Sequence, residues 1–349
     1  MDVLLGKTLT ELQEAALSVG LQKFAGKQLA EWLYVKRATS FDQMTNISLK
    51  GREALKARYI IGRRAPVREA VSQDGTRKYL FEIQPQNAQS GEAGRFVEAV
   101  YIPEEDRATL CVSTQAGCKM GCRFCMTGTL GFHGHLSAAD ILNQIFYFED
   151  LTNIVFMGEG EPMDNLDNIL RALEIMTADY GCAWSPKRIT VSTVGIPAMK
   201  RFLEESECHL AVSMHNPFSV ERKEIMPAEK LMSITDIVTL LKQYDWSHQR
   251  RVSFEYICWA GLNDTPRHAN ELLRLLKGLS CRINLIRFHE GVEDVSTTHK
   301  ENRHFPASNE KQMEWLRDYL TKNGITTTIR KSRGEDILAA CGMLVNSLK

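Results

Sequence analysis

Apolar and polar positions along this chain follow two periods, which together predict a succession of strands and helices. From residue 153 onward, short apolar runs typical of buried strands alternate with segments whose apolar residues recur at helical spacing. The predicted strands are 153–157, 188–192, 209–214, 252–257, 282–287 and 325–329, and the predicted helices are 166–176, a segment after Pro197, 234–241, 265–276 and 310–320. This alternation predicts an α/β fold: a parallel sheet with helices outside it, open or closed as a barrel.

A different pattern precedes the alternating part. Residues 8–60 predict short helices, and residues 63–66 look like a linker. Strand-like runs follow at 78–83, 96–102 and 108–114, and Ser137-Ala-Ala-Asp140 resembles a capping box that opens a helix ending near Phe148.

Glu98 stands out in the middle strand-like run. Period-two alternation places it on one face with Phe96, Val100 and Ile102. An ionised carboxylate in an apolar row is costly unless it is paired. The alternative is an acid on an edge strand, in contact with water.

Charge is unevenly distributed along the chain. The whole sequence has 43 Lys or Arg and 43 Asp or Glu, whereas residues 1–70 hold 12 basic and 7 acidic residues, a local charge of +5. A basic accessory unit on a neutral protein indicates a polyanionic partner. A solvated helix face accounts for the same charges equally well.

Composition narrows the class of protein. With 349 residues, 44% hydrophobic and 25% charged, the chain suits a soluble protein with one large core and a small accessory domain. We find no apolar run near the ~20 residues of a membrane span and no signal-peptide pattern at the amino terminus. Nine Cys, three of them clustered, favour a reducing compartment over a disulfide framework. We therefore expect a cytoplasmic protein without membrane contact.

The three clustered thiols, Cys118, Cys122 and Cys125, have the spacing CxxxCxxC. Thiolates on one short loop can hold an iron–sulfur cluster or zinc. Without a nearby fourth Cys, one iron of a 4Fe–4S cluster would lack a protein ligand and could bind a small molecule. The alternative is a zinc knuckle closed by His133 or His135.

Polar residues follow the predicted strands, at the edge where sites on such sheets lie. Gly158-Glu-Gly-Glu-Pro162 combines glycines that permit close approach of a ligand with Glu161, an acceptor for an ammonium group. Ser192 and Ser213 are hydroxyls at the ends of the next two strands. Taken alone, the glycine segment could be a plain turn and the serines local caps.

With Phe124 before its last Cys, the triplet resembles the radical-SAM superfamily signature, CxxxCxΦC with an aromatic at Φ. The resemblance implies that the three Cys hold a 4Fe–4S cluster whose open iron binds S-adenosylmethionine. One electron from the cluster then cleaves this cofactor to methionine and a 5′-deoxyadenosyl radical.

Further motifs narrow the resemblance to the RlmN/Cfr family of radical-SAM RNA adenosine methyltransferases. They are Phe156-Met-Gly-Glu-Gly-Glu-Pro162, Ser185-Pro-Lys-Arg-Ile-Thr-Val-Ser-Thr-Val-Gly195, Ala211-Val-Ser-Met-His215 and the segment from Arg330 to Gly342. The resemblance runs through nearly the whole chain. It implies a partial (β/α)6 barrel in residues 108–349, a strand extension in 67–107 and a helical RNA-binding domain in 1–66.

The family's chemistry implies roles for three further residues. Cys341 matches the thiol that one S-adenosylmethionine methylates. The radical from a second S-adenosylmethionine then abstracts hydrogen from that S-methyl group. The resulting methylene radical adds to the adenine ring and links RNA to the protein. Cys111 matches the thiol that releases the product by forming a disulfide, and Glu98 matches the carboxylate that moves a ring proton.

The cofactor contacts are also implied by the resemblance. Those expected for S-adenosylmethionine are Phe124, Gly160, Glu161, Ser192, Ser213 and His289. The chain departs from the family at His289, where Asn is usual, and its segment 290–306 is longer than usual. Four further thiols are expected to be small buried hydrophobes, namely Cys182, Cys208, Cys258 and Cys281.

The expected reaction is methylation of carbon 2 of an adenosine in 23S rRNA, with tRNA as a candidate second substrate. Gly-Glu-Pro at 160–162 is typical of carbon-2 enzymes, whereas residues 124–128 and 284–287 resemble carbon-8 enzymes. A flavodoxin or ferredoxin is the expected electron donor, and a monomer is expected. The alternatives are carbon-8 methylation, a radical-SAM enzyme acting on protein or a small molecule, and a zinc-stabilised RNA-binding module without catalysis.

Overall fold

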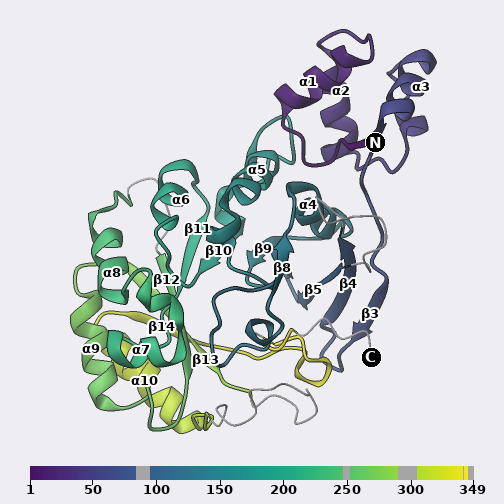
Figure 1. Ribbon diagram of the computed structural model, residues 1–349. Helices are drawn as coiled ribbons and strands as arrows, with labels where there is room; N and C mark the ends of the chain where they lie inside the picture. The colour runs from purple at the N-terminus through teal and green to yellow at the C-terminus, as the bar shows by residue number, and fades with distance from the viewer. Residues whose placement is uncertain (84–94, 247–251, 290–304, 341, 345–349) are drawn as a thin grey trace.

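The computed structural model describes residues 1–83, 95–246, 252–289, 305–340 and 342–344. Its first 60 residues form a helical unit at one end of the molecule (Figure 1). The elements of this unit are α1 (Leu9–Ser18), α2 (Ala25–Ala30), the π-helical η1 (Glu31–Val35), the 3₁₀ turn η2 (Phe41–Gln43) and α3 (Leu49–Arg58). Strand β1 (Asp2–Val3) pairs in parallel with β2 (Tyr59–Ile60), which ties the beginning of the unit to its end.

The rest of the chain is built on one ten-stranded sheet in the order β14-β13-β12-β11-β10-β9-β6-β5-β4-β3. Strands β6 and β9 to β14 are parallel, as predicted, and β3, β4 and β5 extend the sheet in antiparallel fashion. Their bounds are β3 (Arg68–Val71), β4 (Arg77–Ile83), β5 (Arg95–Glu104), β6 (Arg107–Cys111), β9 (Asn153–Phe156), β10 (Ile189–Thr193), β11 (His209–Ser213), β12 (Val252–Cys258), β13 (Cys281–Arg287) and β14 (Thr326–Arg330).

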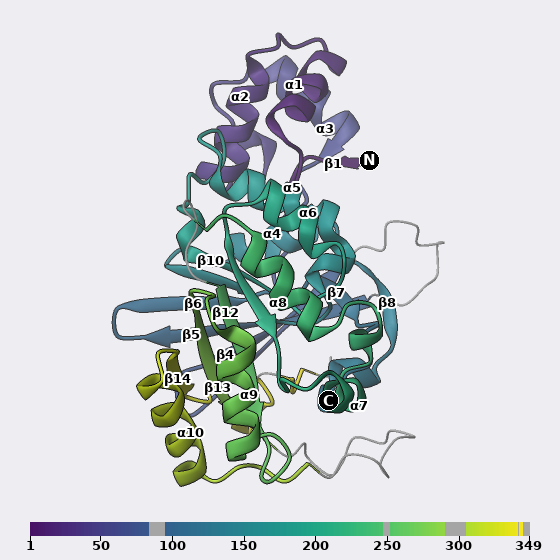
Figure 2. The same ribbon diagram turned by 90° about the vertical axis from the view of Figure 1, so that its left-hand side faces the viewer.

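A helix returns the chain between each pair of neighbouring parallel strands, which gives a partial (β/α)6 barrel with its helices outside (Figure 2). These helices are α4 (Ala138–Phe146), α5 (Leu166–Thr177), α6 (Met199–Glu205), α8 (Ile234–Gln243), α9 (Pro266–Leu276) and α10 (Glu310–Lys322). The predicted capping box opens α4, since the Ser137 hydroxyl accepts from the Asp140 amide and the Asp140 carboxylate accepts from the Ser137 amide. Within the described ranges, none of the helices is both long enough and apolar enough to span a bilayer.

Loops after the strands carry smaller elements that the hydrophobic pattern does not predict. They are the antiparallel pair β7 (Gln115–Gly117) and β8 (Phe132–His135), the helix α7 (Ser219–Ile225), and the 3₁₀ turns η3 (Thr127–Thr129), η4 (Pro162–Asn165), η5 (Pro186–Arg188), η6 (Pro227–Lys230) and η8 (Glu335–Ile337).

The helical unit packs on the outer helices of the barrel, at a distance from the sheet (Figure 1). Glu11 on α1 forms an ion pair of 2.6 Å with Arg171 on α5. In the predicted linker, the Arg64 amide donates to the Asn143 side chain on α4 at 2.8 Å, and the Asn143 amide group donates back to the Arg64 carbonyl at 3.0 Å. These contacts fix the position of the basic unit relative to the barrel.

Glu98 lies within the sheet, because β5 is hydrogen-bonded to β4 on one side and β6 on the other. Its side chain is 2% exposed, and its Oε1 is 3.1 Å from Nζ of Lys78 on β4. The alternative of an edge-strand acid in contact with water is therefore wrong. The pairing that a buried carboxylate needs is present.

Candidate active site

The carboxyl ends of the parallel strands surround a cavity of ≈ 180 Å³, which we call the cysteine cavity. Its wall combines residues at or next to the ends of β6 and of β9 to β14 with the loop that carries the three clustered Cys. Sites on parallel α/β sheets are expected at this edge. The predicted site residues that line it are Cys111, Cys118, Cys122, Phe124, Cys125, Gly160, Glu161, Ser192 and Ser213.

The cysteine loop, residues 118–125, is held at its base by the β7–β8 pair. The Cys118 amide donates to the Gly131 carbonyl at 2.9 Å. Gly117 precedes it with φ +70°, and a Cβ at that position would lie 1.8 Å from the Gly131 oxygen. Only glycine allows the two backbones to approach so closely.

The three thiols are poor ligands until a cationic centre is present. Burial raises the pKa of Cys118 to about 12, and the neighbouring Cys125 adds to the shift. Burial also raises the pKa of Cys122 and Cys125, and proximity to the other two thiols adds to the effect at Cys122. A metal centre would favour the thiolate forms.

The donor set suits an iron–sulfur cluster, since three soft sulfur ligands border one cavity. In the described ranges, however, no three His, Cys, Asp or Glu side chains are already placed to hold a metal ion together.

The two histidines of the zinc alternative lie outside the cysteine cavity. His133 is exposed, with Nε2 2.7 Å from the Leu130 carbonyl. His135 is also exposed, with Nδ1 3.1 Å from the Gln115 side-chain nitrogen. Neither imidazole is placed as a fourth ligand for the thiols.

The glycine segment after β9 packs tightly against the chain that follows β6. A Cβ on Gly158 would lie 2.6 Å from Oγ of Ser113, and one on Gly160, where φ is +98°, would lie 2.6 Å from Cβ of Gln115. The Glu161 amide donates to the Gln115 side chain at 2.8 Å. This packing directs Glu161 to the cavity wall.

Glu161 is a buried carboxylate with three donors. It accepts from the Thr193 hydroxyl at 2.6 Å, the Val194 amide at 2.9 Å and the Met163 amide at 3.0 Å. Burial nevertheless raises its pKa to about 7, against the lowering effect of these hydrogen bonds. A cationic ligand in the cavity would favour the ionised form.

The remaining predicted cofactor contacts divide into two groups. Ser192, Ser213 and Phe124 line the cysteine cavity, where the ring of Phe124 meets the edge of His215 at a centroid distance of 4.9 Å. His289 is absent from this lining; its ring nitrogens contact the Ser332 hydroxyl and, at 3.4 Å, the Glu335 carboxylate. Its cofactor role remains a prediction, and residues 290–304 of the segment predicted to be long lie outside the described residues.

No role was assigned from the sequence to three polar residues in the cavity wall, His215, Glu255 and Arg330, although its motifs include His215 and Arg330. Burial lowers the pKa of His215 to about 3, and this neutral ring accepts from the Ile257 amide at 3.0 Å. Glu255 is 4% exposed and 3.3 Å from Arg330. Glu255 lies on a predicted strand, and Arg330 directly follows another. These positions were the sequence signal that could have identified both as residues of the site.

Cys111 ends β6 and contacts the carboxyl-terminal segment. It packs against an apolar cluster formed by Val100 on β5 with Ala339 and Leu344. Cys111 pairs with Val100 in the sheet register, so the cluster is anchored on two neighbouring strands. The predicted resolving thiol is thus next to residues from both sides of position 341.

Position 341 itself lies outside the described residues, and its predicted role rests on the sequence. Its chain neighbours Ala340 and Gly342 both line the cysteine cavity. The Met126 amide donates to the Gly342 carbonyl at 2.7 Å, which ties the segment to the end of the cysteine loop.

Glu98 is absent from the lining of the cysteine cavity and lines a second cavity of ≈ 240 Å³. Lys78 and Leu338 also line this second cavity. The ammonium of Lys78 donates to the Leu338 carbonyl at 3.3 Å and pairs with Glu98. The carboxylate therefore faces the carboxyl-terminal segment a few residues before position 341.

Comparison with known proteins gives matches over the whole molecule. Residues 3–61 match the family described as "Ribosomal RNA large subunit methyltransferase N-terminal domain", and residues 112–276 match the "Radical SAM superfamily". "Probable dual-specificity RNA methyltransferase RlmN" of Bacteroides fragilis is 56% identical over 347 residues, covering 98% of this chain and 95% of that protein. The chain belongs to the RlmN family of radical-SAM proteins.

More distant relatives support the same family assignment. "Dual-specificity RNA methyltransferase RlmN" of Syntrophus aciditrophicus is 38% identical, covering 97% of this chain and 94% of that protein. The crystal structure of a radical SAM methyltransferase from Sphaerobacter thermophilus superposes with a TM-score of 0.88 at 34% identity, covering 99% of this chain and 100% of that one. A zinc-stabilised module without catalysis is inconsistent with membership in the RlmN family.

Membership in the RlmN family implies a 4Fe–4S cluster and S-adenosylmethionine as cofactors. The cysteine cavity offers residues that suit both, with thiols at one wall and Glu161, Ser192 and Ser213 at another. Four other thiols lie outside that cavity and are buried or half-buried, as expected of small apolar side chains: Cys182, Cys208, Cys258 and Cys281.

Proposed function

We propose that this protein methylates carbon 2 of an adenosine in 23S rRNA, with tRNA as a second substrate, through a methyl group carried on Cys341. One observation carries the proposal: Cys111, the cysteine loop and both chain neighbours of position 341 line a single cavity. That arrangement suits a reaction needing a cluster and two further thiols. The names of the relatives, which record dual-specificity RNA methyltransferases, support two RNA substrates.

In this proposal each wall of the cysteine cavity has its own task. Cys118, Cys122 and Cys125 hold the cluster, which when bound supplies the electron for reductive cleavage of S-adenosylmethionine. Glu161 binds the ammonium group of the cofactor, and Ser192 and Ser213 bind its carboxylate or ribose. Phe124 and its aromatic neighbours exclude water from the cavity.

The thiol pair releases the product. While RNA is joined to Cys341 by a thioether, the Cys111 thiolate attacks the Cys341 sulfur. A sulfur–sulfur bond forms, and the sulfur–carbon bond breaks, with its electron pair passing to the methylene carbon. A proton completes the methyl group, and the thiols remain as a disulfide for an external reductant.

Glu98 is proposed to accept the proton that leaves carbon 2 of the ring. Its place opposite the segment before position 341 supports this role. Lys78, which pairs with Glu98 at 3.1 Å, holds this carboxylate beside the carboxyl-terminal segment.

RNA is proposed to approach over the basic helical unit. At the start of α2, Phe24 is 64% exposed, and Lys23 and Lys27 are exposed on either side of it. Lysines contact phosphates, and an exposed aromatic ring can stack on an unpaired base. The target adenosine must be unpaired or flipped to reach the cavity.

Nucleoside mass spectrometry tests the proposal. The reconstituted enzyme should convert unmodified 23S rRNA to a product containing 2-methyladenosine, whereas a Cys341→Ala variant should cleave S-adenosylmethionine and methylate no RNA. Detection of 8-methyladenosine would overturn the choice of carbon 2. Full activity of the Cys341→Ala variant would overturn the thiol-carrier reaction, and a methyl group on the Cys341 peptide would support it.

A further inference from the structure

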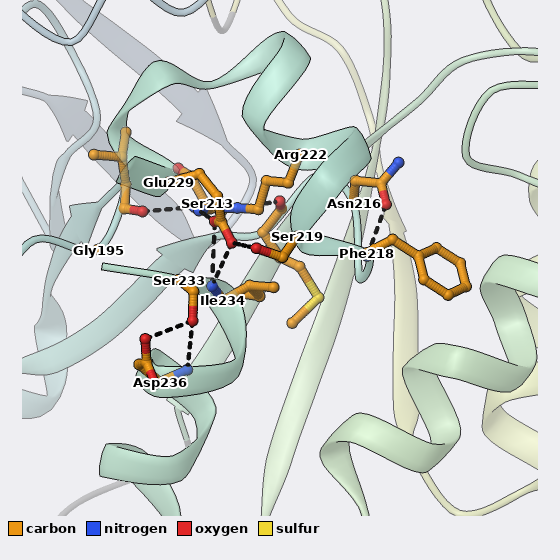
Figure 3. A network of polar contacts seen from close by, with 12 residues as sticks. Gly195, Ser213, Asn216, Phe218, Ser219, Arg222, Glu229, Ser233, Ile234 and Asp236 are labelled. Carbon is orange, nitrogen blue, oxygen red and sulfur yellow. Dashed lines mark hydrogen bonds and ion pairs between the residues drawn. The ribbon is translucent and has the colours of Figure 1, made fainter. Parts of the chain in front are cut away.

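A guanidinium group is fully buried behind the strand ends of the cysteine cavity. Arg222 on α7 is 0% exposed, and its Nε donates to the Met214 carbonyl at 2.9 Å. One terminal nitrogen donates to the carbonyls of Val194 at 2.6 Å and Ser213 at 2.8 Å. Figure 3 shows this side chain reaching from its helix to the ends of two strands.

The opposite terminal nitrogen of Arg222 donates to the buried carboxylate of Glu229. Glu229 also accepts the Ile234 amide, at 2.9 Å and 3.2 Å to its two oxygens, at the beginning of α8 (Figure 3). The positive charge of Arg222 is thus paired with Glu229, and its other N–H groups donate to main-chain carbonyls. A buried ion pair is often no more stabilising than an apolar group of the same size, so stability alone does not explain its presence.

The carbonyl acceptors belong to the segments that build the cavity wall. Val194 directly follows β10, and its amide donates to Glu161 while its carbonyl accepts from Arg222. The preceding Thr193 hydroxyl donates to the other Glu161 oxygen. Holding the Val194 peptide in place therefore also fixes the direction of the Glu161 carboxylate.

Ser213 is held in the same manner. The Ser213 carbonyl accepts from Arg222, and Ser213 lines the cysteine cavity at the end of β11. One guanidinium thus fixes the ends of both β10 and β11. The two strands supply different proposed contacts to the same cofactor.

We propose that Arg222 is a positioning residue for S-adenosylmethionine: it fixes the ends of β10 and β11 so that Glu161 and Ser213 meet the amino-acid end of the cofactor. Arg222 itself lies behind the wall and is absent from the cavity lining. This inference rests on the proposed assignment of the cysteine cavity as the cofactor site.

Equilibrium dialysis of labelled S-adenosylmethionine against the reconstituted holoenzyme tests the inference. Arg222→Gln should raise the dissociation constant by about tenfold or more, the effect of losing hydrogen bonds from a charged group. Arg222→Lys should lie between Arg222→Gln and the unchanged protein, because one ammonium can still reach part of the carbonyl set. The cleavage rate at saturating cofactor should change less than the dissociation constant, and the iron and sulfide content should stay the same.

A second route covers the case in which Arg222→Gln fails to fold. Glu229→Gln keeps the shape of the partner and removes its charge, so it should weaken cofactor binding in the same direction. Asn143→Ala is the matched control, because Asn143 is also buried and bonded to main chain, on the outer helix α4. This control should lower the melting temperature and leave the dissociation constant unchanged.

Two further outcomes separate the inference from the site assignment. If Glu161→Gln weakens binding but the folded Arg222→Lys, Arg222→Gln and Glu229→Gln variants bind as tightly as the unchanged protein, Arg222 is structural only and the inference is wrong. If Glu161→Gln also leaves binding unchanged, the cavity assignment fails and the inference with it.

Discussion

Lys78 and Glu98 form a buried ion pair on neighbouring strands, with Nζ 3.1 Å from Oε1. The two side chains are only 10% and 2% exposed, and the same ammonium donates to the Leu338 carbonyl. Lys78 therefore joins the proposed proton acceptor to the segment that leads to Cys341. A change at Lys78 therefore removes a contact with that segment together with the ion pair.

Lys78→Met should lower the free energy of unfolding by about 3 kcal/mol, because removing one partner of a buried pair leaves the other charge uncompensated. Urea denaturation measures the change. Adding Glu98→Gln to this variant should restore part of the loss, since no charge then remains to be compensated. As a control, Arg201→Met removes two pairs, with Glu205 and Asp167, in which all three side chains are at least 48% exposed, and it should cost at most about 1 kcal/mol. Equal costs for the two variants would contradict the description of Lys78 and Glu98 as a buried pair.

Glu161 should make the stability of the cofactor-free protein depend on pH. Its pKa is raised from 4.5 to about 7 in the folded chain. The folded state therefore binds a proton at Glu161 more tightly than the unfolded state. The stability that this gives is fully present below pH 4.5 and is lost as pH rises through 7. The resulting fall in unfolding free energy is at most about 3 kcal/mol. Denaturation curves from pH 5 to pH 8 should show it, and Glu161→Gln should abolish it.

Cofactor binding should depend on pH in the opposite direction. An ammonium group favours ionised Glu161, so affinity for S-adenosylmethionine should fall about tenfold per pH unit below 7. Dialysis at several pH values measures the slope. A slope that persists in Glu161→Gln would assign the titration to another group.

The order of strands and helices was predictable because parallel strands buried on both faces leave short apolar runs in the sequence. The cysteine loop was predictable because its ligands are close together in the chain. Arg222 was not, because Ser-Val-Glu-Arg-Lys-Glu at 219–224 looks like a solvated helix surface. Only the tertiary fold turns this one charge inward, toward carbonyls that are distant in sequence. The β7–β8 pair was missed for a related reason, since its strands are short and mostly polar or Gly.

Gly160 should tolerate no side chain. Gly160→Ala adds a methyl group 2.6 Å from Cβ of Gln115 at φ +98°, so the turn that presents Glu161 must shift. We expect cofactor affinity to fall by more than tenfold, the factor that corresponds to about 1.4 kcal/mol. Gly324→Ala is the matched control, because Gly324 has φ +95° and open space around its Cβ position. The control should cost about 1–2 kcal/mol of stability from backbone strain and leave cofactor affinity unchanged. Equal binding losses in both variants would show that strain, and not the contact with Gln115, controls the site.

Cys111→Ala should trap the protein on its RNA. The other described thiols that line the cavity are Cys118, Cys122 and Cys125, which the proposal assigns to the cluster, so without Cys111 the thioether to the adenine should persist. A denaturing gel should then show a protein–RNA adduct that nuclease digestion reduces to a nucleotide on the Cys341 peptide, detected by mass spectrometry. Cys182→Ala removes a thiol outside the cysteine cavity and should release methylated RNA normally. Repeated turnover by Cys111→Ala would mean that release needs no second protein thiol, and adducts in both variants would indicate slow release unrelated to Cys111.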